Sequence, residues 1–104
     1  DDAVLLMRSY GAFADNRNTN ATSLGSIGFS DYTDKGGATV ITIFNPTSSS
    51  SYTFALWQNA GASTIGTPVR KGIGVLKVAE SHTGINFTAS STIAGVAASV
   101  YGVK

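Results

Sequence analysis

Short runs in which hydrophobic and polar residues alternate recur along this chain, and they predict β-strands. The clearest run is residues 39–44, where nearly every residue is β-branched and both faces are apolar, so we expect a central strand. Asn45 and Pro46 should end this strand, because proline has no N–H group to donate to a neighbouring strand. The next run, residues 52–58, alternates strictly, with Tyr52, Phe54 and Leu56 on one face and Thr53, Ala55 and Trp57 on the other.

Five further runs have strand character and give the chain an all-β pattern. Residues 3–13 begin as a continuous apolar run and then alternate, so a helix is the alternative there. The other four are residues 26–32, 73–81, 85–87 and 96–100. Glycines at positions 36 and 37 supply a hairpin signal before residues 39–44. Seven short strands with turns at nearly regular spacing predict an antiparallel β-sandwich.

Two long polar segments interrupt the strand pattern. Residues 15–23 are entirely polar apart from Ala21, and their side chains favour turns, so we expect an exposed loop. Residues 59–72 are rich in Gly, Ala, Ser and Thr and form the longest loop candidate. Loops of this length in a compact domain commonly carry function, which makes both segments candidate binding sites.

Composition narrows the classes of function. Charged residues are only 12% of the 104 residues, against a usual share of about 25%, whereas hydrophobic residues are at a normal 42%. The net charge is +1 and basic residues are scattered except at Arg70 and Lys71, so we expect no nucleic-acid partner. The longest apolar stretch, residues 93–100, is far shorter than the roughly 20 residues that span a bilayer, so we expect no membrane insertion. A chain of this length holds one core, which predicts a single domain over residues 1–104.

Catalytic chemistry has few candidates in this sequence. His82 is the only histidine, and on a strand it would share a face with Glu80, which could orient its imidazole. No nucleophile motif, second histidine or cysteine accompanies this pair. We therefore expect no enzymatic activity, no cofactor and a structural role for His82 at a strand end or turn.

The first polar loop contains several oxygen-bearing side chains that could bind a cation. Asp15, Asn16, Asn18 and Asn20 supply oxygen atoms there, but only Asp15 is charged and Arg17 lies among them. Calcium takes about six to eight oxygen ligands and usually several carboxylates. An ordinary turn is the better interpretation, and we expect no metal.

Aromatic side chains are the remaining candidates for recognition. Trp57 and the four tyrosines could offer flat faces to sugar rings. In a small sandwich most aromatic residues instead pack in the core or across strands. Both interpretations remain open for Trp57 at this point.

Several short motifs follow one another in a distinctive order: Arg8-Ser9-Tyr10 in an opening strand that ends at Phe13, then Gly25-Ser26-Ile27-Gly28-Phe29, Tyr32-Thr33-Asp34 before a Thr/Val strand, and Ser51-Tyr52-Thr53-Phe54. This order resembles that in the C-terminal domains of tailed-bacteriophage tail fibres. Residues 32–44, 46–54 and 93–103 look similar to the strand, the short linker and the final valine-rich strand of those domains. The long segment 59–72 departs from that pattern.

This resemblance implies a distal fibre tip, trimeric and extracellular on the virion, that binds a glycan or protein receptor on the host cell surface. The chain would then be the C-terminal fragment of a longer fibre protein, in keeping with its start at Asp1. The second possibility is a carbohydrate-binding or adhesin module of a bacterial surface protein. The third is a purely structural virion domain. Apolar residues on both faces of the terminal strands also favour association into a homotrimer.

Two sets of residues are the candidates for these contacts. The polar loops predict receptor contacts, because amides can donate and accept hydrogen bonds to sugar hydroxyls and cations can pair with anionic envelope groups. The receptor-binding candidates are Asn16, Arg17, Asn18, Asn20, Arg70 and Lys71, together with Trp57. The trimer-interface candidates are Ala3, Leu5, Met7, Val96, Ala98 and Val100.

Overall fold

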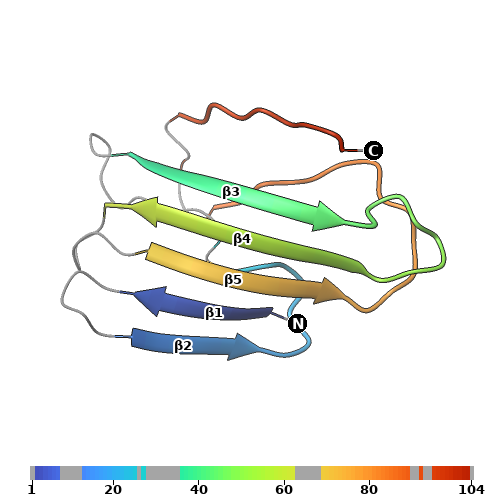
Figure 1. The fold of residues 1–104 in the computed structure, drawn as a ribbon, viewed down its shortest axis with the longest axis horizontal. Coiled ribbons are helices and arrows are strands. Elements are labelled where there is room, and N and C mark those ends of the chain that lie inside the picture. Colours follow the sequence, from blue (N-terminus) through green and yellow to red (C-terminus); the bar gives the residue numbers. More distant parts are fainter. Residues whose placement is uncertain are drawn as a thin grey trace.

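A single antiparallel sheet contains all the strands of the part of the chain that the structure, a computed structural model, describes: residues 2–7, 13–25, 27, 36–62, 69–89, 92 and 95–103. The strands are β1 (Asp2–Met7), β2 (Phe13–Asn18), β3 (Gly37–Phe44), β4 (Thr53–Gly61) and β5 (Val69–Leu76) (Figure 1). Their order across the sheet is β2-β1-β5-β4-β3, so β2 and β3 are the two edges. No helix occurs among the described residues, and hence none there is long and apolar enough to cross a membrane. The all-β prediction is confirmed for these residues.

The hairpin of β3 and β4 follows the sequence closely. The strand β3 ends at Phe44, directly before Asn45 and Pro46, as predicted. Asn45 has a φ of 58°, and its carbonyl accepts a hydrogen bond from the Ser48 N–H at 3.2 Å, which closes a tight turn. Asparagine tolerates this left-handed backbone better than most residues. The turn returns the chain into β4 so that Phe44 lies opposite Phe54.

The buried face of the sheet is centred on Trp57. Ala55 and Trp57 alternate with exposed residues along β4, and Trp57 is 2% exposed. Trp57 lies opposite Gly72 of β5 and Ile41 of β3. We call this side of the sheet the inner face; its buried centre is formed by Ala55, Trp57, Asn59, Gly72 and Gly74, with the half-buried Ile41 and Ile43 beside them on β3. Leu24 and Ile27 pack on it from the segment that follows β2.

A buried amide joins that segment to the sheet. The side chain of Asn59, 3% exposed, donates a hydrogen bond from Nδ2 to the Ile27 carbonyl at 2.6 Å. Thr39, which lies opposite Asn59 on β3, donates from Oγ1 to the same carbonyl at 3.1 Å. Two donors from adjacent strands thus hold the backbone of Ile27 against the inner face.

The prediction that residues 39–44 form a central strand is wrong for the described sheet. The strand β3 pairs with β4 and lies at an edge. Apolar residues on both faces of a strand favour burial of both faces, but they do not indicate whether both edges of the strand are hydrogen-bonded. The interior positions of the sheet belong to β1, β5 and β4.

Both predicted loops are shorter than expected because strands extend into them. Residues 15–18 belong to β2, paired with β1 in the register Asp2↔Asn18, so the loop begins only after Asn18. Residues 59–61 end β4 and residues 69–72 begin β5. Polar and glycine residues are accepted here because neighbouring strands satisfy their backbone groups. The single run predicted over residues 3–13 is likewise divided between β1 and the first residue of β2, with residues 8–12 outside the described part.

Of the later predicted strands, residues 73–81 form a strand only as far as Leu76, and residues 85–87 and 96–100 do not form strands. The strand β5 ends at Leu76, and residues 77–89 and 95–103 contain no regular secondary structure. The predicted strand at residues 26–32 lies outside the described residues except for Ile27, which is in a bend. A seven-stranded sandwich is therefore not confirmed.

Candidate functional site

The side of the sheet opposite Trp57 is an exposed surface with a regular arrangement of side chains. We call it the outer face and define it by Val40, Thr42, Leu56, Gln58, Lys71 and Ile73, all of which are exposed. Strand pairing aligns them in two rows, one with Val40, Gln58 and Lys71, the other with Thr42, Leu56 and Ile73. Val40 is 72% exposed, Ile73 55% and Leu56 44%, so nothing in the described part of the chain covers these apolar residues.

A shallow hollow lies on this outer face. It has a volume of about 600 Å³ and is lined by residues of β3, β4 and β5, including Val40, Leu56, Gln58 and Lys71. Its apolar carbons can pack against a sugar ring or an apolar protein surface. The Gln58 amide can donate and accept hydrogen bonds, and the Lys71 ammonium can donate to anionic or neutral oxygen atoms. The arrangement suits binding of a partner.

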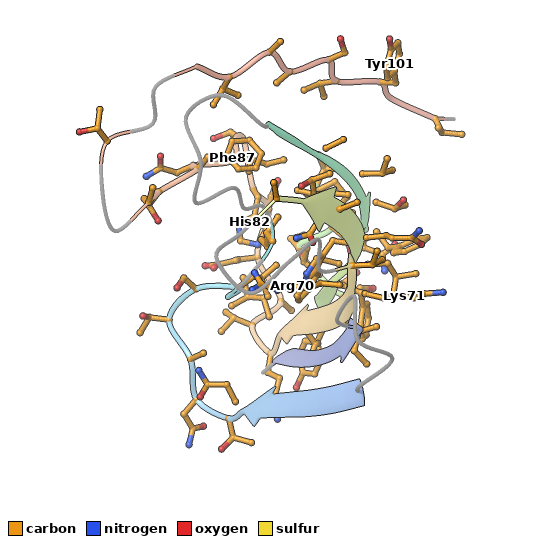
Figure 2. The ribbon with its side chains drawn as sticks, turned by 90° about the vertical axis from the view of Figure 1, so that its left-hand side faces the viewer. Arg70, Lys71, His82, Phe87 and Tyr101 are labelled. Atoms are coloured by element: carbon orange, nitrogen blue, oxygen red, sulfur yellow. The ribbon has the colours of Figure 1, made fainter. Side chains whose placement is uncertain are left out.

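Arg70 and Lys71 do not form the cationic pair that the sequence predicts. They are consecutive residues of β5, and consecutive side chains of a strand point to opposite faces. Figure 2 shows Lys71 pointing away from the sheet on one side, while Arg70, His82 and Phe87 lie on the other. Lys71 is exposed, whereas Arg70 is half-buried and lies opposite Asn59. Only Lys71 remains a receptor-binding candidate on the outer face.

The four candidates from the first polar loop lie at the other edge of the sheet. Asn16, Arg17 and Asn18 belong to β2, which is separated from β5 by β1. Asn18 and the exposed Asn20 are at the end of the sheet where β2 finishes, on the row of Asp2 and Gly74. The link from β4 to β5 leaves at Gly61, at the opposite end. The candidates from the two polar segments therefore lie apart on the sheet, and their receptor contacts stay predictions.

Trp57 cannot contact a receptor from its position in this structure. At 2% exposure it is the largest fully buried side chain among the described residues, and it lies on the inner face. This position agrees with the interpretation of Trp57 as a core residue and gives no support to the prediction that it contacts a receptor. Strict alternation identified its face but could not tell which face is covered.

His82 lies on the same side of the sheet as Arg70 and is half-buried. Its backbone N–H donates to the Pro46 carbonyl at 2.7 Å, which ties the segment after β5 to the turn between β3 and β4. Glu80 is exposed, and residues 80–82 do not form the strand on which the two side chains would share a face.

The predicted interface residues fall in two unlike places. Ala3, Leu5 and Met7 belong to β1, which is hydrogen-bonded on both edges, to β2 and to β5. Val96, Ala98 and Val100 lie in the exposed C-terminal segment, where Val100 is 86% exposed. Of the two groups, only the second has no backbone hydrogen bond with the described residues.

Sequence reasoning missed most of the outer face. The alternation of Phe54 and Leu56 with Ala55 and Trp57 marks two faces of the strand. Both faces carry large apolar side chains, so the alternation does not show that Leu56 lies on the exposed one. The overlooked signal lies in β5, where Gly72 and Gly74 leave room for one large side chain on the face that they share.

Comparison of the chain with protein-family models, with curated proteins and with solved structures finds no match. The features that bear on function are the outer face, the edge of β3 that no described residue pairs with, and the sequence pattern. They favour binding and association.

Proposed function

We propose that this chain is the distal domain of a bacteriophage tail fibre, located on the virion as a homotrimer, and that it binds a glycan or protein receptor on the host cell. The observation that carries the proposal is the outer face, a sheet surface with exposed apolar residues and a hollow lined by Gln58 and Lys71. Exposed apolar patches of this kind mark interaction surfaces.

The sequence pattern supports the same class of protein. The ordered motifs between Arg8 and Phe54 resemble tail-fibre C-terminal domains. The low share of charged residues, 12%, and the abundance of hydroxyl and amide side chains suit a stable extracellular particle that recognises sugars.

Association would also supply the second layer that the described sheet lacks. We propose that the β-sandwich predicted from the sequence is completed between copies, with the later apolar segments contributing to it. Val78, Ile85 and Phe87 are each 50–55% exposed, so these segments gain burial when another layer covers them.

Binding of the full chain to bacterial envelope polymers tests the receptor part of this proposal. Labelled chain is applied to whole cells of a panel of species and to purified lipopolysaccharide, capsular polysaccharide and teichoic acid. We expect a subset to bind and Lys71→Ser to weaken that binding about tenfold, the loss typical of a hydrogen bond to a charged group. Lys77→Ser is the matched control, because it removes the same charge just beyond the end of β5.

The outcomes separate the proposal from its alternative. Binding by a folded monomer with one purified glycan favours the carbohydrate-binding or adhesin module. An absence of binding to every cell and polymer in the panel contradicts receptor binding and leaves the purely structural virion domain. Equal loss in the Lys71 and Lys77 variants would remove the outer face as the site.

A further inference from the structure

The strand β3 presents an edge without the protection that sheet edges usually carry. It pairs with β4 on one side, and no described residue hydrogen-bonds to its backbone along the other. Its eight residues, Gly37–Phe44, contain no charge and no proline. Exposed edges normally carry charges, prolines or bulges that prevent pairing with another chain. The opposite edge strand, β2, does carry Asp15 and Arg17.

The C-terminal segment, residues 95–103, has the complementary property. It is extended along the β3 side of the sheet in both views (Figures 1 and 2) and contains no strand. Val96 is 69% exposed, Val100 86% and Val103 97%. A Cβ placed on Gly95 or Gly102 would meet no atom within 4 Å, so the segment runs through open space. It too contains no charge and no proline.

The surface area of the whole chain shows that burial is incomplete. The chain exposes 7777 Å² at a mass of 10.7 kDa, whereas a folded monomer of that mass exposes about 5,500 Å². The excess is about 2,300 Å², in the range that an obligate interface removes. The radius of gyration, 14.5 Å, also exceeds the value of about 13 Å for a compact domain of this length.

We propose that residues 95–103 of one copy add as a strand to the edge of β3 in a neighbouring copy. A segment of matching length that has no charge and no proline, with valines at Val96, Val100 and Val103, is what an open edge accepts in β-strand addition. Within one chain the segment already runs on the β3 side, yet its valines stay exposed, so the pairing is assigned between copies. Each copy then donates one segment and accepts one, and a ring with cyclic symmetry leaves no edge of β3 open.

This inference rests on the self-association proposed above but not on receptor binding. If the chain is a folded monomer, both the trimer and the strand addition are wrong. If the chain is an oligomer and its association does not depend on residues 95–103, only the strand addition is wrong. Binding to envelope polymers decides neither.

Proline substitution tests the backbone pairing directly. Ala98→Pro combined with Ser99→Pro removes two consecutive N–H donors, which point to opposite edges of an extended strand, so one of them faces β3 in either register. The segment makes no hydrogen bond with the described residues of its own chain. We expect association, measured by sedimentation of the full chain, to weaken at least about tenfold, because each lost ladder bond contributes to the interface. Ser49→Pro is the control in the exposed turn between β3 and β4, outside the later apolar segments, and should leave association unchanged. Unchanged association of the double variant overturns the proposal.

Cross-linking of mixed variants identifies which chain supplies the strand. The chain has no cysteine, so Thr42→Cys in one preparation and Val100→Cys in another are the only thiols present. After the two are mixed, unfolded and refolded together, a short bis-maleimide should join one chain of each kind. A doubly substituted chain that cross-links only within itself, or mixed chains that never join, would overturn the exchange between copies even if the proline variant does not fold.

Discussion

The indole of Trp57 lies directly over the backbone of Gly72, its partner on the neighbouring strand. A Cβ at Gly72 would overlap the indole ring, with Nε1 only 2.7 Å away, and a Cβ at Gly74 would meet Leu24 and the far edge of the same ring. Two glycines on one face of β5 thus form the floor on which the largest buried side chain packs. This contact fixes which face of the sheet is the inner one.

Gly72→Ala should destabilise the protein by about 1–3 kcal/mol, the usual cost of forcing extra volume into a packed site. The indole cannot move away easily, because Leu24 and Ile41 pack around it. Gly84→Ala is the matched control, since a Cβ there would meet nothing within 4 Å. Urea unfolding of the three proteins gives the comparison, and equal midpoints would contradict the packing of Trp57 on Gly72.

Asn59→Ala should lower the free energy of unfolding by about 1–3 kcal/mol. The change removes the donor that holds the Ile27 carbonyl at 2.6 Å and leaves a space on the inner face. Gln58→Ala, one residue earlier and exposed on the outer face, should change stability by less than about 0.5 kcal/mol. Thermal unfolding, monitored by circular dichroism, compares the stability of the two variants. A smaller loss of stability at position 59 than at position 58 would rule out the buried amide as an anchor.

The turn at Asn45 predicts a difference between two substitutions at one position. With a φ of 58°, Asn45→Ala should cost about 1–2 kcal/mol, because alanine lacks the polar side chain that lets asparagine tolerate the left-handed region. Asn45→Gly should cost less, since glycine adopts this backbone freely. Denaturant unfolding midpoints check the order, and a glycine variant less stable than the alanine variant would contradict the argument from the left-handed backbone.

Stability should depend on protein concentration if association completes the fold. Oligomers linked to folding lose apparent stability on dilution by mass action. For a chain of 104 residues we expect the unfolding temperature to fall by about a few degrees for each tenfold dilution. Scanning calorimetry and fluorescence at several concentrations provide the measurement. A constant unfolding temperature would argue for a monomer.

His82→Ala should leave receptor binding within about threefold and the fold intact. The hydrogen bond from position 82 to Pro46 uses the backbone N–H, which alanine retains. A lone imidazole without a positioned nucleophile has no catalytic step to contribute. His82→Pro is the informative partner, because it removes that N–H and should loosen the segment after β5. Loss of activity in a folded His82→Ala protein would require a chemical role for the side chain.

Local sequence patterns predicted the β3–β4 hairpin well. Alternation along residues 52–58 placed Ala55 and Trp57 on one face, and Asn45 with Pro46 marked the end of β3. These features depend on side-chain periodicity and turn chemistry, which are local properties. The candidate site was predicted poorly, because loops were judged by polarity, and strands accept polar residues once their backbones are paired.

The sequence by itself determined that this chain forms strands, where its central hairpin turns, and that its charge is low and nearly balanced. Only the tertiary structure decided that Arg70 and Lys71 belong to opposite faces of one strand, that Trp57 is buried over Gly72, and that β3 lies at an edge. Periodicity assigns residues to faces, but which face is covered and which strand has a free edge depend on partners distant in the sequence. The same reason explains residues 95–103, whose strand-like pattern has no partner among the described residues of its own chain.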